Sequence, residues 1–204
     1  MRIIAGNAGG RRLDAPPPGT RPTTDRVREA LFSSLDSAIR LEHGGWDGVR
    51  VLDLFAGSGA VGLEAMSRGA GSATLVERDR RCAEVLRRNV AAVAPSAHVV
   101  VASATTWTPT GGPFDLVYVD PPYSLPDDDV RAVLSALWRQ GAVADGAVVV
   151  VERSQRTGDP WPDRGFEPLR NRDYGDTRLW YGRASQPGAA SPPRRATTMV
   201  EEEA

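Results

Sequence analysis

Two periods of apolar residues divide this 204-residue chain into alternating elements. Short, nearly continuous apolar runs are typical of buried strands, and such runs occupy positions 49–54, 73–77, 98–102, 114–119 and 147–152. Between and before them, apolar residues recur every three or four positions, which predicts helices over 24–40, 59–69, 79–94 and 126–139. This alternation predicts an α/β fold with a mainly parallel sheet and helices on both faces.

The two ends of the chain have other patterns. Residues 1–20 are basic and rich in glycine and proline, and they predict a small β-hairpin in which Met1–Ala5 pairs with Arg11–Ala15. A closing pair of strands is predicted over 164–183, which makes seven strands in all. The expected parts are therefore the hairpin over 1–20, a main domain over 21–183 and a disordered tail over 184–204.

The apolar run 114–119 ends in Asp120-Pro121-Pro122-Tyr123, the most informative motif in the chain. Two prolines cannot continue a strand, so the chain turns at the strand's carboxyl end, where ligands bind in open α/β sheets. The carboxylate and the Pro121 carbonyl can accept hydrogen bonds from an –NH2 group, and the tyrosine ring can stack on a planar partner. An ordinary strand-ending turn would use the same residues. The motif resembles the [DN]-P-P-[YF] motif of S-adenosylmethionine-dependent amino-methyltransferases.

A glycine turn follows the first strand and reads Asp53-Leu54-Phe55-Ala56-Gly57-Ser58-Gly59. Its glycines allow close approach of the backbone to a ligand, and the next helix offers free N–H groups at its start. With Gly62 the spacing also matches the G-x-G-x-x-G pattern of dinucleotide sites, which is a weak signal alone. The acidic Asp53 ahead of the glycines instead resembles the first motif of class I methyltransferases. There the acid helps to hold the amino-acid end of the cofactor.

Glu77 ends the strand 73–77. A carboxylate at the end of the second strand can accept both ribose hydroxyls of a nucleoside. Sites for NAD and for S-adenosylmethionine share this device, so Glu77 predicts a nucleoside without choosing between them. Because no hydride-transfer constellation is visible, the Asp120–Tyr123 motif favours methyl transfer.

The composition limits the class of protein. An apolar content of 41% fits one globular domain. The single cysteine, Cys82, allows no intramolecular disulfide and fits a reducing cytoplasm. We expect neither membrane nor metal, since no apolar run reaches membrane-spanning length and the two histidines and the cysteine are scattered. The formal net charge is −1, yet residues 1–28 hold six arginines.

Motifs spread along the chain are similar to one family. They are Met1-Arg2-Ile3-Ile4-Ala5-Gly6, Arg21-Pro22-Thr23-Thr24-Asp25-Arg26-Val27-Arg28-Glu29-Ala30-Leu31-Phe32, the glycine turn, Asp120–Tyr123 and Tyr174-Gly175-Asp176-Thr177. Over roughly residues 1–183 the chain resembles the RsmD family, bacterial 16S rRNA guanine-N2 methyltransferases. The resemblance implies a Rossmann-like class I methyltransferase fold and S-adenosylmethionine as the donor, with S-adenosylhomocysteine as the product. It also implies guanine 966 as the target, presented on a partly assembled 30S subunit.

The resemblance further implies three sets of site residues. The catalytic residues would be Asp120, Pro121, Pro122 and Tyr123. The cofactor would contact Thr24, Arg26, Asp53, Phe55, Gly57, Ser58, Gly59, Glu77, Arg78, Ser103, Ala104 and Asp120. The RNA would contact Arg2, Arg11, Arg12, Arg21 and Arg28. Two departures matter: Ser103-Ala104 stands where the family often has Asp-Ala, and Tyr123 stands where many members have phenylalanine.

The hairpin over 1–20 is expected to lie outside the sheet core as an RNA clamp on a monomer, although it could instead cover the cofactor cleft. Other functions stay open, namely methylation of adenine N6 in nucleic acid or of a protein glutamine, a non-catalytic RNA-binding role, and dinucleotide oxidoreduction. Glutamine enzymes usually carry asparagine at the first motif position, where this chain has Asp120. DNA adenine enzymes usually need an added target-recognition region, for which this chain has no room.

Overall fold

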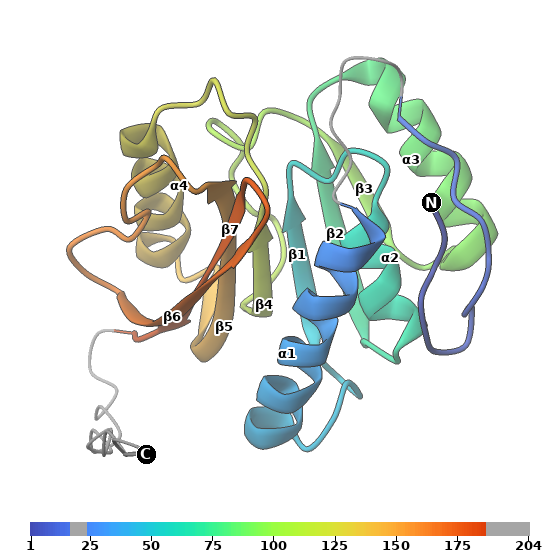
Figure 1. Ribbon diagram of the computed structural model, residues 1–204, viewed down its shortest axis with the longest axis horizontal. Coiled ribbons are helices and arrows are strands. Elements are labelled where there is room, and N and C mark those ends of the chain that lie inside the picture. Colours follow the sequence, from blue (N-terminus) through green and yellow to red (C-terminus); the bar gives the residue numbers. More distant parts are fainter. Residues whose placement is uncertain (17–23, 187–204) are drawn as a thin grey trace, which may run out of the picture.

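The computed structural model describes residues 1–16 and 24–186 and contains a seven-stranded sheet in the order β3-β2-β1-β4-β5-β7-β6 (Figure 1). The strands are β1 (Arg50–Leu54), β2 (Ser72–Glu77), β3 (His98–Val101), β4 (Phe114–Val119), β5 (Val143–Ser154), β6 (Phe166–Tyr174) and β7 (Thr177–Ala184). The helices are α1 (Asp25–His43), α2 (Ala60–Ser67), α3 (Arg80–Val93) and α4 (Asp127–Arg139). In the described part of the chain, no helix combines the length and apolarity that a membrane span requires.

Strands β1 to β5 pair in parallel, and β7 pairs antiparallel with both β5 and β6. The predicted elements are confirmed, with boundaries that differ by a few residues at most positions. The largest difference is in β5, which begins at Val143 where the apolar pattern predicts 147. Asp145 and Gly146 interrupt the apolar pattern there. The backbone of β5 nonetheless pairs with β4 at Val143, and the register between the two strands shifts between Phe114 and Leu116.

Local chemistry begins and ends the helices. The Thr24 hydroxyl accepts a hydrogen bond from the Val27 amide at 3.3 Å and caps α1, which ends at Gly44 in a left-handed conformation. Asp79 caps α3 by accepting from the Arg81 and Cys82 amides. These caps satisfy backbone groups that a helix leaves without intrahelical partners.

Two apolar clusters pack on opposite faces of the sheet. One contains buried residues of α1, α2 and α3, and the other contains the buried face of α4. Successive residues of β4 alternate between them, since Leu116 and Tyr118 belong to the first and Val117 and Val119 to the second. The expectation of helices on both faces is therefore confirmed.

The N-terminal segment corrects one expectation. Backbone bonds join Ile3 to Arg11 and Leu13 to Met1, and Arg2 bridges Arg12, so the predicted pairing exists over a short length. The segment does not lie outside the core, however, because Ile3 and Leu13 are buried in the cluster that α1, α2 and α3 form. Burial of these two side chains makes the segment part of the domain's packing.

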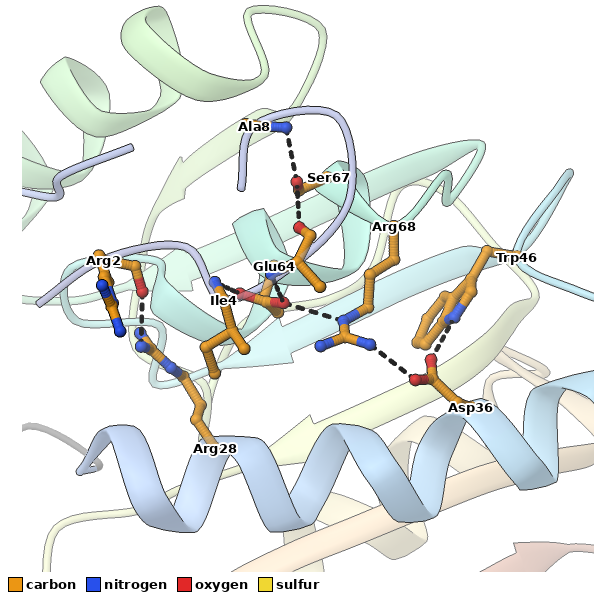
Figure 2. Close-up of polar contacts among 10 residues, drawn as sticks. Arg2, Ile4, Ala8, Arg28, Asp36, Trp46, Glu64, Ser67 and Arg68 are labelled. Carbon is orange, nitrogen blue, oxygen red and sulfur yellow. Dashed lines mark hydrogen bonds and ion pairs between the residues drawn. The ribbon is translucent and has the colours of Figure 1, made fainter. Parts of the chain in front are cut away.

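Polar contacts fasten the same segment to α2 (Figure 2). The buried Glu64 carboxylate accepts from the Ile4 and Ala5 amides at 2.6 and 3.0 Å, and Ser67 accepts from the Ala8 amide. Gly6, at φ +82°, lies so close that a Cβ would stand 1.9 Å from the Ser67 carbonyl oxygen. The tip of the hairpin is thus held against the end of a helix.

Candidate active site

A cavity of about 810 Å³ opens at the carboxyl ends of β1, β2, β4 and β5. Helix α1, the N-terminal segment and the β6–β7 turn also border it. Most of the residues expected at the cofactor or at the target meet here. They are Thr24, Arg26, Asp53, Phe55, Gly57, Ser58, Glu77, Arg78, Asp120, Pro121, Pro122 and Tyr123.

Asp53 lies at the inner end of the glycine turn and is almost fully buried. Its carboxylate accepts a hydrogen bond from the Gly62 amide at 2.9 Å, which joins β1 to the first turn of α2. Burial raises the pKa of Asp53 to about 7, although the bond from Gly62 opposes the shift and Glu77 adds to it. The carboxylate therefore shapes the turn as well as facing the cavity.

Gly59 shows why the turn needs glycine. Its φ is +82°, and a Cβ there would lie 2.4 Å from a methyl carbon of Leu86. A side chain would have to displace α3 or bend the turn. The glycine itself is not among the cavity-lining residues, so its part is to let the turn pack against α3.

Glu77 also holds the turn. One of its carboxylate oxygens accepts from the Gly57 amide at 2.9 Å and the other from the Asp79 amide at 2.7 Å. Each carboxylate oxygen has a second acceptor site, so these bonds are compatible with ribose contacts. Figure 1 shows β1 and β2 side by side, and their parallel register places the glycine turn and Glu77 at the same edge.

Phe55 has a backbone conformation that is unusual for its residue type. Its φ is +65°, in the left-handed region that bulky side chains rarely adopt. The Ala56 amide nonetheless bonds to the Val76 carbonyl at 2.9 Å, which keeps this part of the turn on the edge of β2. Such strain is found where surrounding structure fixes a binding site, and Phe55 lines the cavity.

The Asp120–Tyr123 motif follows β4 and borders the cavity. A buried arginine of β5, Arg153, holds the loop after it by donating to the Leu125 carbonyl at 2.8 Å and to the Asp127 carboxylate at 2.7 Å. Tyr123 is 49% exposed at the border of the cavity. The sequence signal for Arg153 is a charged residue at the end of a valine-rich strand, and sequence reasoning missed it.

Other cavity residues were also missed. Tyr118 and Glu152 lie on adjacent strands, and the tyrosine hydroxyl donates to the glutamate carboxylate. Met1 and Pro16 border the cavity from the N-terminal segment. The β6–β7 turn from Asp173 to Thr177 completes the wall, and its Tyr-Gly-Asp-Thr stretch could have been recognised from its place in the family motif.

The structure separates two residues expected at the cofactor. Ser103 and Ala104 do not line the cavity. The Ser103 hydroxyl lies 2.8 Å from that of Thr105, and Ala104 is buried in the cluster on the α4 face. A local hydroxyl pair and packing on the opposite face explain why these side chains turn away.

The arginines expected at RNA have different surroundings. Arg2, Arg11 and Arg12 are exposed, while Arg21 lies outside the described residues. Arg28 corrects the prediction because it is fully buried, donating to the Arg2 carbonyl at 2.6 Å and to Asp25 at 2.8 Å. Burial lowers the pKa of Arg28, with Asp25 opposing the shift. Its guanidinium joins α1 to the N-terminal segment and cannot reach a phosphate.

The arrangement can hold a nucleoside at one end and a planar amine at the other. Carboxylates and backbone amides surround the glycine turn, while the opposite end has a carboxylate, two prolines and an aromatic ring. Among the described residues no group of three or more His, Cys, Asp or Glu side chains is placed to hold a metal ion.

Comparisons with known proteins agree with this geometry. The family model described as "Conserved hypothetical protein 95" matches residues 1–183. Ribosomal RNA small subunit methyltransferase D of Escherichia coli K12 is 42% identical over 163 residues, which cover 78% of each chain. The solved structure of the Escherichia coli methyltransferase yhhF superposes with a TM-score of 0.75 at 37% identity, covering 91% of this chain and 98% of that one.

A release factor glutamine methyltransferase of Bifidobacterium longum is also similar, at 31% identity over 216 residues, covering 94% of this chain and 70% of that protein. The solved structures establish a Rossmann-like class I methyltransferase fold.

Proposed function

The chain belongs to the RsmD family, and we propose that it transfers a methyl group from S-adenosylmethionine to the exocyclic N2 of a guanine in 16S rRNA. The observation that carries the proposal is the single cavity that joins the glycine turn to the Asp120–Tyr123 motif. Methyl transfer needs donor and amine within one enclosure, and this cavity has room for both. The family's target, guanine 966, is the nucleotide we propose.

The cofactor end fits S-adenosylmethionine by its chemistry. When bound, that molecule supplies an electrophilic methyl group on a positively charged sulfur. Glu77 would accept the ribose hydroxyls, and Asp53 with Thr24 and Arg26 would border the amino-acid end. Because Glu77 already bonds to an amide of the glycine turn and Asp53 to an amide of α2, the site is shaped before any ligand enters.

At the target end, the amine is a weak nucleophile because the N2 lone pair is delocalised into the guanine ring. Hydrogen bonds from N2 to Asp120 and to the Pro121 carbonyl would favour a more tetrahedral nitrogen and direct its lone pair at the methyl group. Such positioning can lower a barrier by about 7–11 kcal/mol. Methylation would leave N2 positively charged with an acidic proton, which Asp120 or water would accept.

The target base must leave its stack, which costs roughly a few kcal/mol. Stacking on Tyr123 would return about 1–3 kcal/mol of this cost. The exposed Arg2, Arg11 and Arg12 lie on the N-terminal segment beside the cavity wall that Met1 and Pro16 form. We propose that the phosphates of the RNA bind there. The RNA would be part of a partly assembled 30S subunit, and the protein would act on it as a monomer in the cytoplasm.

A protein glutamine is the second candidate, since the release factor methyltransferase resembles this chain over most of its length. A primary amide would fit the same acceptors. The carboxylate of Asp120 favours guanine over a protein glutamine as the substrate, because glutamine enzymes of this kind usually carry asparagine at that position.

The test is methyl transfer by the purified protein from labelled S-adenosylmethionine. We expect label in 16S RNA of small-subunit particles that lack the modification, in the form of N2-methylguanosine. Asp120→Ala should abolish transfer while it keeps affinity for S-adenosylhomocysteine, because its work is on the amine. Label in release factor or in N6-methyladenosine would reject the proposal.

A further inference from the structure

Two carboxylate residues lie on adjacent strands just beyond the point where the pairing of β4 with β5 ends. The last paired residues of the two parallel strands are Val119 and Val151, so the next residues, Asp120 and Glu152, stand level with each other. Neighbouring strands are about 4.8 Å apart. Both residues line the cavity, and the function proposed above uses only Asp120.

Both side chains belong to one face of the sheet. Asp120 follows the last residue of β4 and comes two positions after Tyr118, so a continued alternation of the strand places it on the face of Tyr118. The Tyr118 hydroxyl donates to the Glu152 carboxylate, which places Glu152 on that face as well. The resulting pair of acceptors therefore points into the same part of the cavity.

Glu152 is held rather than solvated. Only 6% of the residue is exposed, and Tyr118 beneath it is 2% exposed. The bond from the Tyr118 hydroxyl helps to fix the orientation of the carboxylate at the cavity wall. A carboxylate that accepts one hydrogen bond can accept others as well.

We infer that Glu152 is a specificity-determining residue that accepts a hydrogen bond from N1–H of the target guanine. The inference rests on the proposed function and identifies how the base is chosen. Guanine presents two adjacent donors, N1–H and the N2 amine, and two adjacent carboxylates match them. In adenine the atom next to the amine is N1, which is an acceptor. The Glu152 carboxylate is also an acceptor, so the two would repel each other. Sites that hydrogen-bond a substrate N–H reject analogues without it.

The matching role of Tyr118 is positioning. Its hydroxyl donates a hydrogen bond to Glu152, and its ring packs in the apolar cluster that contains α1, α2 and α3. Tyr118→Phe should keep the packing and remove the hydrogen bond. Its effect should therefore resemble a weaker form of the loss of Glu152, with a higher KM for the RNA and little change in affinity for S-adenosylhomocysteine.

The experiment compares guanosine with 2-aminopurine riboside at the methylated position of 16S RNA in small-subunit particles. The analogue keeps the N2 amine but has an unprotonated N1. The wild-type protein should prefer guanosine. Glu152→Gln should lower kcat/KM for guanosine by about 10- to 100-fold. Its amide N–H can donate to the bare N1, so the preference for guanosine should shrink by at least about tenfold. Because both proteins meet the same analogue, its missing O6 cancels in the comparison.

Asp176→Asn is the matched control, since it removes a carboxylate from the cavity wall at the β6–β7 turn. It should leave the preference as in the wild type. Unchanged affinity for S-adenosylhomocysteine will show that each variant is folded, and Tyr118→Phe supplies a second test if Glu152→Gln fails this check.

The outcomes separate the two proposals. If the wild type makes N2-methylguanosine and Glu152→Gln keeps the full preference, the inference is wrong and the proposed function stands. If the wild type makes no N2-methylguanosine, both are wrong.

Discussion

Single side chains in this protein have two tasks. Glu77 accepts from a backbone amide of the glycine turn, Asp53 accepts from an amide in the first turn of α2, and both also line the cavity. Arg153 likewise fixes the loop after the Asp120–Tyr123 motif from the interior of β5. Hydrogen bonds made before a ligand arrives do not have to be formed during binding, so the site is organised in advance.

Asp53 predicts an unusual dependence of stability on pH. Burial raises its pKa from 3.8 to about 7. The folded protein therefore keeps a proton that the unfolded chain releases near pH 4, and the free energy of unfolding should fall as the pH rises from about 4 to about 7. The contribution is on the order of a few kcal/mol. Asp53→Asn keeps an acceptor for Gly62 and should lose this dependence.

Denaturant unfolding of both proteins without ligand, at several pH values, measures the effect. The difference in unfolding free energy between Asp53→Asn and the wild type should grow in favour of the variant as the pH rises. A difference that stays constant would mean that Asp53 titrates in the folded state as it does in the unfolded chain.

Tyr123 should act through its ring. Half of the residue is exposed beside the cavity, where we expect a base to stack on its ring. Tyr123→Ala should lower kcat/KM for the RNA by about 5- to 150-fold, which corresponds to the loss of one stacked base. Tyr123→Phe should be mild. Equal damage from the two substitutions would show that the hydroxyl has a role.

At the scale of elements, the spacing of apolar residues was a sufficient guide in the main domain. Its helices could be predicted because their apolar residues recur every three or four positions, and buried strands such as β4 because their residues form a nearly continuous apolar run. Among residues 1–16, the described part of the N-terminal segment, only Ile3 and Leu13 are buried apolar side chains, so no period reveals how the segment docks. Its anchors are Glu64 and Ser67, nearly sixty residues away along the chain.

Because the N-terminal segment is packed against the domain, we expect its removal or damage to affect the whole domain, unlike that of a separable clamp. Ile3 is fully buried, so Ile3→Ala should lower the free energy of unfolding by about 2–5 kcal/mol. Because Met1 borders the cavity, the affinity for S-adenosylhomocysteine should fall as well. Thermal unfolding and calorimetry measure the two effects.

Arg12→Ala is the control on the same segment. Arg12 is exposed, so its loss should change stability by no more than about 0.5 kcal/mol. It should weaken RNA binding and reduce the salt dependence by about one unit of slope if it contacts a phosphate. If Ile3→Ala changed neither stability nor cofactor affinity, the segment would be a separable clamp after all.

At the scale of the molecule, only those site residues could be predicted that belong to a motif at the end of a strand. Asp53, Glu77 and Asp120 could be placed together because parallel strands bring their carboxyl ends to one edge. Glu152 and Arg153 could not, since β5 carries no motif and its role comes from register with β4. Arg28 was misassigned because a charge in a basic stretch gives no sign of burial.

The central claim is that one cavity brings a methyl donor to the N2 amine of a guanine in 16S RNA. Mass mapping of that RNA from a strain without the gene tests the claim most directly. We predict that one N2-methylguanosine is lost, that the wild-type gene restores it and that Asp120→Ala does not. A complete set of N2-methylguanosines in that strain would contradict the account, as would restoration by the Asp120→Ala protein.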